Sequence, residues 1–388
     1  MPWLKRVAVS GHWSAKDFDV DLTVEGAEKP RHLILTGPNG AGKTTILDAI
    51  GPKSILSAWS NVQFSDRFAV SLTWTHEGSV CHEAYQAGHL IGAYLPAKRS
   101  SHVEIPTGPR RLAIDTVEPK RPLADQFLQF LINQQVQARL ADLAIPAERA
   151  EHDAIMAWFT DLEDAFAELF ERPGLRLVFD RKTYTMHFDA PGMPSVGFNQ
   201  LAAGHASLVA ILAELILRID AAKFGLTRDA ADLSGVVLID ELSLHLHPSL
   251  QEKILPFLTR AFPRLQFIVA THSPAVISSV PDALVVDLGS GRVIPSSELQ
   301  GTPYGELMQS HFGIESDIDI ASTRALERLE TLDQKSDRTP AEDTELAALA
   351  ERLTRTSHPL ALEVYNRTLA RRLRAEAAAT EHHAEAGR

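Results

Sequence analysis

The sequence predicts an α/β fold, in which a mixed sheet is covered by helices and accompanied by an antiparallel sheet near the amino terminus. Two observations predict the mixed sheet. A strand-like segment, His32–Thr36, is followed at once by a glycine-rich loop, and the loop is followed by a helical pattern. Farther along, helix-like segments separate three continuous apolar runs, which are typical of strands buried on both faces of a parallel sheet; the runs are Val236–Ile239, Gln266–Ala270 and Ala283–Val286.

The first hundred residues alternate short apolar runs with polar turns, a pattern that favours strands of a mainly antiparallel sheet. The predicted strands are Val7–Val9, Phe18–Val24, His32–Thr36, Phe68–Trp74 and Leu90–Tyr94.

From Leu123 to Glu171 the apolar period changes to about 3.6 residues, which predicts an inserted helical arm. Two helices of about 20 residues each span only about 30 Å, so the arm is too short to form a long coiled coil. One face of the second helix carries most of the apolar side chains: Ile155, Trp158, Phe159, Leu162, Phe166, Leu169 and Phe170.

After the arm we expect a hairpin formed by Leu175–Asp180 and Tyr184–Phe188, and then an apolar helix over Ser207–Ile219. From about residue 321 the pattern is helical and highly charged. We therefore divide the chain into a first half of the α/β domain (1–120), the helical arm (121–174), a second half of the same domain (175–310) and a helical tail (311–388).

The composition limits the functions that this chain can have. Its 388 residues are 45% hydrophobic and 23% charged, which is ordinary for folded globular chains, and its formal net charge is −12. An acidic protein has no overall positive field for nucleic acid or anionic membranes, so any such contact needs a local basic patch. The one cysteine, Cys81, cannot form an internal disulfide. With neither a secretory signal nor an apolar run of about 18 residues, the sequence predicts a cytoplasmic protein that does not span a membrane.

The glycine-rich loop has the spacing G-x-x-x-x-G-K-[ST] of a phosphate-binding P-loop (Walker A motif), and it lies between a strand and a helix as that motif requires. Its glycines allow successive backbone N–H groups to point at one phosphate, and Lys43 adds a positive charge near the β- and γ-phosphates. The Thr44 hydroxyl is suited to bind Mg²⁺. We expect ATP and Mg²⁺ as cofactors, and nucleotide contacts from Gly37, Pro38, Asn39, Gly40, Ala41, Gly42, Lys43, Thr44 and Thr45.

Two further motifs follow buried strands. Val236–Ile239 leads directly into Asp240 and Glu241. Asp240 is positioned to hold Mg²⁺, and Glu241 to orient or deprotonate the attacking water. The run Gln266–Ala270 leads to His272, whose imidazole is placed to detect the terminal phosphate. We predict Glu241, His272 and Lys43 as catalytic residues, and Thr44 and Asp240 as metal ligands.

These motifs, GPNGAGKTT, VVLIDELSLHLHP and ATHSP, occur in the order found in ABC-type ATPases related to the SMC, RecF and OLD groups. The DE-x-x-x-HLHP form resembles the stand-alone bacterial AAA-family ATPases of phage-defence and virulence-associated operons, including those of Septu and retron systems. The resemblance covers roughly residues 1–310. It implies an ABC-type ATPase head that binds ATP between two heads placed head to tail.

The resemblance also identifies a signature segment, residues 201–207, which in such ATPases contacts the γ-phosphate held by the other head. Gly204 and Ser207 are its candidate contacts. Ala202 and His205 depart from the transporter form LSGGQ, and Leu242 and Ser243 replace the Pro and Glu usual in related defence ATPases. Because Glu241 is intact, we expect hydrolysis to be retained.

Several weaker patterns have two interpretations. His245 and His247 form an H-x-H pair that fits either a metal site without an evident third ligand or a segment contacting the dimer partner. Trp13 fits either an adenine contact or core packing. Two basic clusters fit either nucleic-acid contact or solvated surface: Lys98, Arg99, Arg110 and Arg111 form one, and Arg367, Arg371, Arg372 and Arg374 form the other.

The function expected from the resemblance is an ATP-hydrolysing molecular switch that forms a homodimer or higher oligomer through its heads and controls a partner. Because no acid-rich nuclease domain follows the head, we expect a nuclease or toxin effector on a separate chain, in anti-phage defence. The alternatives are a DNA-repair ATPase of the RecF type, the ATP-binding subunit of an ABC transporter, and a binding module in which ATP is structural.

Overall fold

The computed structural model divides the chain into two compact units, Met1–Gly313 and Ile314–Arg388, which we describe separately. It describes residues 2–27, 29–51, 68–99, 102–112, 114, 122–142, 146–224, 233–312, 320–335, 337–354, 362, 364–366 and 369.

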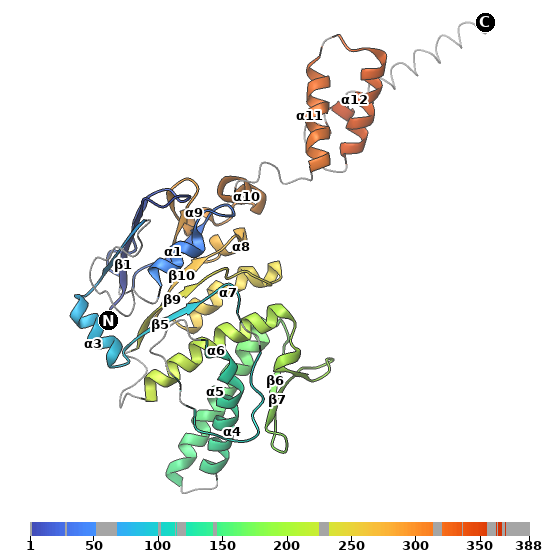
Figure 1. The fold of residues 1–388 in the computed structure, drawn as a ribbon. Helices are drawn as coiled ribbons and strands as arrows, with labels where there is room; N and C mark the ends of the chain where they lie inside the picture. Colours follow the sequence, from blue (N-terminus) through green and yellow to red (C-terminus); the bar gives the residue numbers. More distant parts are fainter. Residues whose placement is uncertain are drawn as a thin grey trace, which may run out of the picture. The chain divides into compact units, whose positions relative to one another are not determined.

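The first unit is built on a mixed sheet, in which we find six strands among the described residues (Figure 1). Five run parallel, and the edge strand β12 runs antiparallel to β11. In spatial order the strands are β12 (Arg292–Pro295), β11 (Ala283–Asp287), β3 (His32–Thr36), β10 (Leu265–Ala270), β9 (Ser234–Ile239) and β5 (Leu90–Leu95).

Both faces of this sheet are buried, which explains the continuous apolar runs. On β3, Leu33 and Leu35 point into one hydrophobic core while Ile34 points into the other. Strands β9 and β10 divide their side chains between the same two cores. The prediction of a buried parallel sheet is therefore confirmed.

A second, antiparallel sheet has the order β2 (Phe18–Asp21), β1 (Leu4–Ser10) and β4 (Ala69–Trp74). The segment predicted as Phe18–Val24 ends early because the Asp21 carboxylate accepts hydrogen bonds from the backbone and hydroxyl of Thr23, which turns the chain.

The assignment of His32–Thr36 and Leu90–Tyr94 to this antiparallel sheet is wrong. Both segments are buried along their whole length and pair in parallel within the mixed sheet. Their uninterrupted burial is the physical reason, since a strand with one solvated face would alternate. The structure also adds a helix that the sequence analysis did not predict, α3 (Gly78–Gln86).

The helical arm lies beside the mixed sheet and packs on α6 (Ala203–Phe224), with a small sheet next to it (Figure 1). It consists of η1 (Ala124–Gln126), α4 (Phe127–Asp142) and α5 (Pro146–Leu169). The apolar face predicted for α5 is confirmed: Ile155 and Trp158 are partly buried, and the other five side chains are buried. The small sheet comprises β6 (Arg176–Asp180), β7 (Thr185–Asp189) and β8 (Val196–Gly197), with η2 (Phe198–Gln200) following.

Most of the remaining helices of this unit follow strands of the mixed sheet, and the last one follows another helix. They are α1 (Lys43–Ile50), α7 (Pro248–Ala261), α8 (Pro274–Ile277), α9 (Ser296–Leu299) and α10 (Tyr304–Phe312). Across the described part of the chain, no helix has the length and apolar character needed to cross a membrane.

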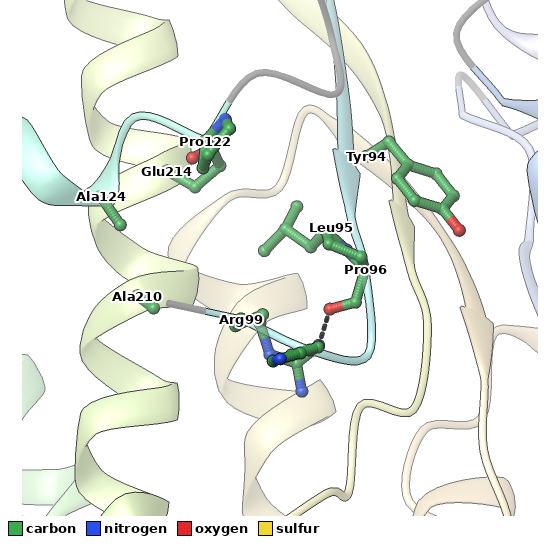
Figure 2. Close-up of a pocket in the computed structure, with 9 residues that line it drawn as sticks. Tyr94, Leu95, Pro96, Arg99, Pro122, Ala124, Ala210 and Glu214 are labelled. Carbon is green, nitrogen blue, oxygen red and sulfur yellow. Dashed lines mark hydrogen bonds between the residues drawn. The ribbon is translucent and has the colours of Figure 1, made fainter. Parts of the chain in front are cut away.

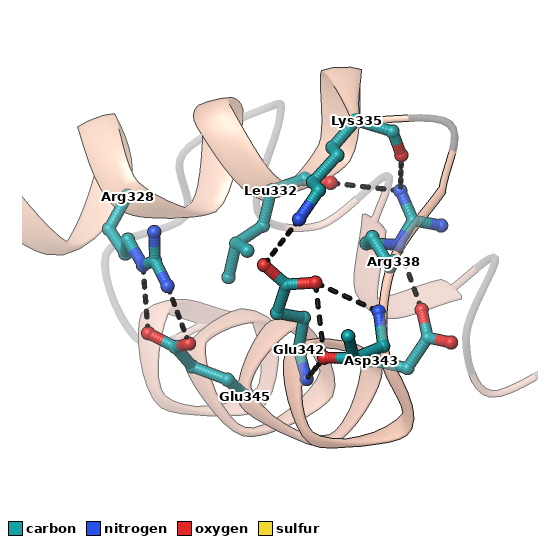
Figure 3. Close-up of polar contacts among 8 residues, drawn as sticks. Arg328, Leu332, Lys335, Arg338, Glu342, Asp343 and Glu345 are labelled. Atoms are coloured by element: carbon teal, nitrogen blue, oxygen red, sulfur yellow. Dashed lines mark hydrogen bonds and ion pairs between the residues drawn. The ribbon is translucent and has the colours of Figure 1, made fainter.

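The second unit contains the predicted charged helices, α11 (Ile320–Gln334) and α12 (Pro340–Leu353). Leu329, Leu332, Leu346 and Leu353 are among the buried residues of its own small core. Ion pairs join the helices and the turn between them, including Arg328 with Glu345 and Lys335 with Glu342 (Figure 3). Thr339 begins α12 with a capping box closed by Glu342.

Candidate nucleotide-binding site

The P-loop connects β3 to α1 in a backbone conformation that depends on glycine. Gly37, Gly40 and Gly42 have φ angles of 136°, 80° and 95°. A Cβ on Gly42 would lie 2.4 Å from Cε1 of His12, which is closer than non-bonded carbon atoms approach each other. The loop can therefore turn its amides toward one point only with glycine at this position.

Lys43 folds back over the loop that precedes it. Its Nζ donates hydrogen bonds to the carbonyl oxygens of Gly37 (3.1 Å) and Pro38 (3.2 Å), and it lies 3.4 Å from Nδ1 of His272. Burial lowers the pKa of the Lys43 ammonium from its ordinary value, while the neighbouring carboxylates of Glu241 and Asp240 act in the opposite direction. A phosphate bound in the loop would place a further negative charge beside this ammonium and favour its charged form.

Thr44 and Asp240 form the predicted metal-binding pair. The Thr44 hydroxyl donates to Oδ2 of Asp240 at 2.9 Å, across 196 residues of sequence. The second carboxylate oxygen, Oδ1, is buried and has no hydrogen-bond partner among the described residues. Burial raises the pKa of Asp240. A hydroxyl beside a buried carboxylate with a free oxygen fits Mg²⁺, whose preferred ligands are oxygens.

Glu241 and His272 lie next to this pair. Oε1 of Glu241 is 3.4 Å from Nε2 of His272, and both side chains remain partly open to solvent. Burial raises the pKa of Glu241, and burial together with the charge of Lys43 lowers the pKa of His272. A basic carboxylate and an imidazole that remains neutral are suited to accept a proton from water and to contact a phosphate.

The topology explains why these residues meet. Strands β3, β10 and β9 are consecutive in the sheet and parallel, so their carboxyl ends lie at one edge. The P-loop, His272 and the Asp240–Glu241 pair follow those three ends. The structure therefore brings together the predicted catalytic and metal-binding residues, with Thr45 in the first turn of α1.

The signature segment lies against the residues that follow Glu241. A Cβ on Gly204 would lie 2.7 Å from the carbonyl oxygen of His245, so this helix start packs closely on the backbone there. Ser207 is only 6% exposed, and its hydroxyl accepts a hydrogen bond from Nε of Arg99 at 3.2 Å. The Ser207 hydroxyl is thus engaged inside its own head.

The structure bears on two of the weaker patterns, Trp13 and the pair of His245 and His247. Trp13 is 62% exposed and stacks on His12 with 4.0 Å between ring centroids, so the core-packing interpretation is wrong and the adenine contact stays a prediction. His247 caps α7 by accepting from the backbone N–H of Ser249. We find no group of three or more potential metal-binding side chains among the described residues.

The first basic cluster is smaller than predicted. Arg99 turns inward and donates to the backbone carbonyls of Asp240 and Glu241. Arg110 pairs with Glu104, whereas Lys98 and Arg111 are exposed. The second cluster, Arg367, Arg371, Arg372 and Arg374, lies outside the described residues.

Sequence reasoning missed the structural position of two residues at the site. Arg99 was counted as surface charge, although it follows the end of β5 directly beside the strand that carries Asp240. His12 was not singled out, although it packs on Gly42. Their contacts are made with backbone atoms of distant segments, and such contacts produce no residue pattern in a sequence.

A P-loop and a carboxylate pair at one edge of a mixed sheet, with an antiparallel sheet and an inserted helical arm, define the P-loop ABC-type ATPase fold. A family model described as "AAA domain, putative AbiEii toxin, Type IV TA system" matches residues 118–278.

Comparison with curated proteins finds partial similarities. The chain is 37% identical over 98 residues to the "Retron Ec83 probable ATPase" of Escherichia coli, which covers 25% of this chain and 18% of that protein. It is 23% identical over 297 residues to the "Septu protein PtuA" of Bacillus mycoides, covering 74% of this chain and 40% of that protein. The matched segments thus span less than half of either relative.

Among solved structures, the SMC head domain from Thermotoga maritima aligns with 75% of this chain and 98% of that chain, at 15% identity and a TM-score of 0.37. The family model and the curated relatives support the resemblance drawn from the motifs: this chain is similar to ABC-like stand-alone ATPases of the defence type.

Proposed function

We propose that this chain is an ATP-binding and ATP-hydrolysing switch, whose heads dimerise with ATP between them and thereby control a separate effector in bacterial anti-phage defence. The observation that carries the proposal is the arrangement at the sheet edge. The Thr44 hydroxyl lies 2.9 Å from Oδ2 of Asp240, and Oδ1 of Asp240 is buried without a hydrogen-bond partner among the described residues. Lys43, Glu241 and His272 lie beside this pair.

Each residue has a distinct task in the proposed reaction. The P-loop amides and Lys43 hold the β- and γ-phosphates, and Thr44 and Asp240 would hold Mg²⁺, which neutralises charge that develops on the phosphate oxygens. Glu241 orients the attacking water and accepts its proton, while His272 contacts the γ-phosphate. Gly204 and the amino end of α6 would contact the phosphate bound by a second head.

The switch and its partner rest on similarity alone. The relatives include a protein named as a retron ATPase and a Septu protein, and the matched segments cover only part of each. A second copy as the dimer partner and a nuclease or toxin as the effector are therefore proposals for this chain, which co-purification from its native host would test.

The Glu241→Gln variant tests the enzymatic part. We expect wild-type protein to release phosphate from ATP in the presence of Mg²⁺, and the variant to bind ATP but turn it over at least about 100-fold more slowly. Because trapped ATP holds the heads together, the variant should also form a dimer with ATP that size-exclusion chromatography with light scattering detects.

A control variant and two alternative outcomes make the result specific. Glu25→Gln removes a carboxylate from an exposed loop and should leave turnover unchanged. Equal turnover by wild-type protein and the Glu241→Gln variant would show that Glu241 is misassigned. Turnover that requires added DNA would favour the RecF-type alternative over a switch driven by a protein partner.

A further inference from the structure

Arg99 contacts three parts of the head: the segment after β5, the backbone after β9 and helix α6. The proposed reaction requires these parts to be aligned. Arg99 follows β5 and stands between the end of that strand and helix α6, on the wall of a cavity of about 160 Å³ (Figure 2). Strand β5 pairs with β9, so the Arg99 loop starts beside the strand end that carries Asp240 and Glu241.

The guanidinium group of Arg99 is almost fully used. Its NH1 donates to the carbonyl oxygens of Asp240 (2.9 Å) and Pro96 (3.2 Å), and its NH2 donates to the carbonyl oxygen of Glu241 (2.9 Å). Its Nε donates to the Ser207 hydroxyl at 3.2 Å. A guanidinium has five N–H donors in a fixed plane, and four of them are engaged here with three separate segments.

The backbone that Arg99 holds is in a conformation that needs support. Glu241 has a φ angle of 49°, in the left-handed region that non-glycine residues seldom adopt because it is strained. Such a conformation persists only where the surroundings impose it. Two adjacent carbonyls bound by one rigid cation supply that restraint, and the turn also sets the direction of the Glu241 carboxylate toward His272.

The contact with Ser207 adds the signature segment to the same group. Ser207 lies in the first two turns of α6, the helix whose start packs on the backbone of His245. A shift of this helix would therefore displace Arg99, and Arg99 would transmit the shift to the carbonyls of Asp240 and Glu241.

We propose that Arg99 is a positioning residue that aims Glu241 and couples its backbone to the signature helix of the same head. This inference rests on the proposed ATPase function only for its consequence in turnover. Arg99 acts through Glu241 and reaches the nucleotide itself at no step. Lysine cannot replace it, because a single ammonium cannot bind two carbonyls, a third carbonyl and a hydroxyl in one plane.

The test uses the full-length chain and the variants Arg99→Lys, Ser207→Ala and Lys98→Ala. Lys98 is the exposed neighbour of Arg99, and its variant controls for the effect of changing another side chain of this loop. For each protein we would measure amide hydrogen exchange without nucleotide, Mg-ATP affinity, and kcat and KM for phosphate release.

We expect Arg99→Lys to lower kcat at least about tenfold while KM and nucleotide affinity change less than about threefold. Exchange should become at least about tenfold faster at the amides of residues 242–244 and in the first turns of α6. Ser207→Ala should speed exchange at the start of α6 only, and Lys98→Ala should match wild-type protein in every measurement. A purely structural role for the positive charge predicts instead that lysine restores wild-type kcat.

Failure of this inference and failure of the ATPase proposal give different results. If wild-type protein releases no phosphate, the proposed function fails, and hydrogen exchange alone decides whether Arg99 joins the two segments. If Arg99→Lys exchanges like wild-type protein in both segments, or keeps wild-type kcat, the positioning role is overturned.

Discussion

Gly42 is the residue of the P-loop with the least freedom to change. It combines a φ of 95° with close approach of the His12 ring, whereas Gly40 has a φ of 80° and open space where a Cβ would stand. We expect Gly42→Ala to weaken ATP binding at least about tenfold, because both the backbone and the His12 ring must move. A fluorescent ATP analogue would measure this affinity.

The matched variant is Gly40→Ala, which introduces backbone strain without a collision. It should weaken binding by less than Gly42→Ala. Equal losses in the two variants would contradict the importance of the His12 contact and leave strain as the common cause.

His32 predicts a pH dependence of stability that is independent of the nucleotide site. Its ring is fully buried: Nδ1 accepts from the Phe267 amide at 3.0 Å, while Nε2 lies 3.3 Å from Nζ of Lys29 and 3.6 Å from Oδ2 of Asp282. Burial, aided by Lys29 and opposed by Asp282, lowers the pKa of His32 from 6.5 to about 4. The folded chain therefore holds His32 neutral in a range where the unfolded chain binds a proton.

Stability from this group is present above about pH 6.5 and is lost as the pH falls toward about 4, since the unfolded state gains protons first. Between pH 7 and pH 5 the free energy of unfolding should fall by about 1 to 2 kcal/mol more in wild-type protein than in His32→Gln. Urea denaturation followed by tryptophan fluorescence would measure the difference, and parallel curves for the two proteins would exclude His32 as the cause.

Among the elements, α6 contains a buried ion pair that joins it to the helical arm. Glu214 accepts from Arg218 at 2.8 Å and, through its second oxygen, from the Leu123 amide at 2.8 Å. Burial raises the pKa of Glu214, while Arg218 acts to lower it. Helix α5 instead contacts α7 through an exposed pair, Glu168 with Arg260.

These two pairs should respond differently to the same substitution. Arg218→Met leaves a buried carboxylate without its cation and should lower the free energy of unfolding by about 3 to 5 kcal/mol. Arg260→Met, at the surface, should change it by less than about 1 kcal/mol. Denaturation followed by tryptophan fluorescence reports on the first unit, which contains all five tryptophans; comparable losses in the two variants would contradict the assignment.

The elements also show what local sequence can and cannot predict. The apolar face of α5 and the buried strands β9, β10 and β11 were predicted because each repeats one strong local pattern. Strand β5 was placed in the wrong sheet because its partner, β9, lies far along the chain and its pairing is decided by tertiary packing.

The same distinction holds at the site. Lys43, Asp240 and His272 could be placed together because each belongs to a recognisable motif that follows a strand. Arg99 could not, because its acceptors at Asp240 and Glu241 are backbone carbonyls 141 and 142 residues away, which any sequence would provide.

At the scale of the whole molecule, the two compact units have separate hydrophobic cores. The core of the second unit is formed by residues of α11 and α12 together with Val364. Leu329 is fully buried there, and Leu307 of α10 is similarly buried in the first unit. Because no buried residue belongs to both cores within the described part of the chain, we expect the units to lose structure independently.

The full-length variant Leu329→Ala tests this independence. Loss of a buried leucine costs about 2 to 5 kcal/mol, which is a large part of the stability that a small helical unit can have. Hydrogen exchange in α11 and α12 should therefore approach the unfolded rate, while β3 and β10 keep their protection and Mg-ATP affinity is unchanged. Leu307→Ala is the matched control and should weaken protection in the first unit alone. If Leu329→Ala also exposes β3, the helical unit supports the head, and the proposed switch must include it as part of the same cooperative structure.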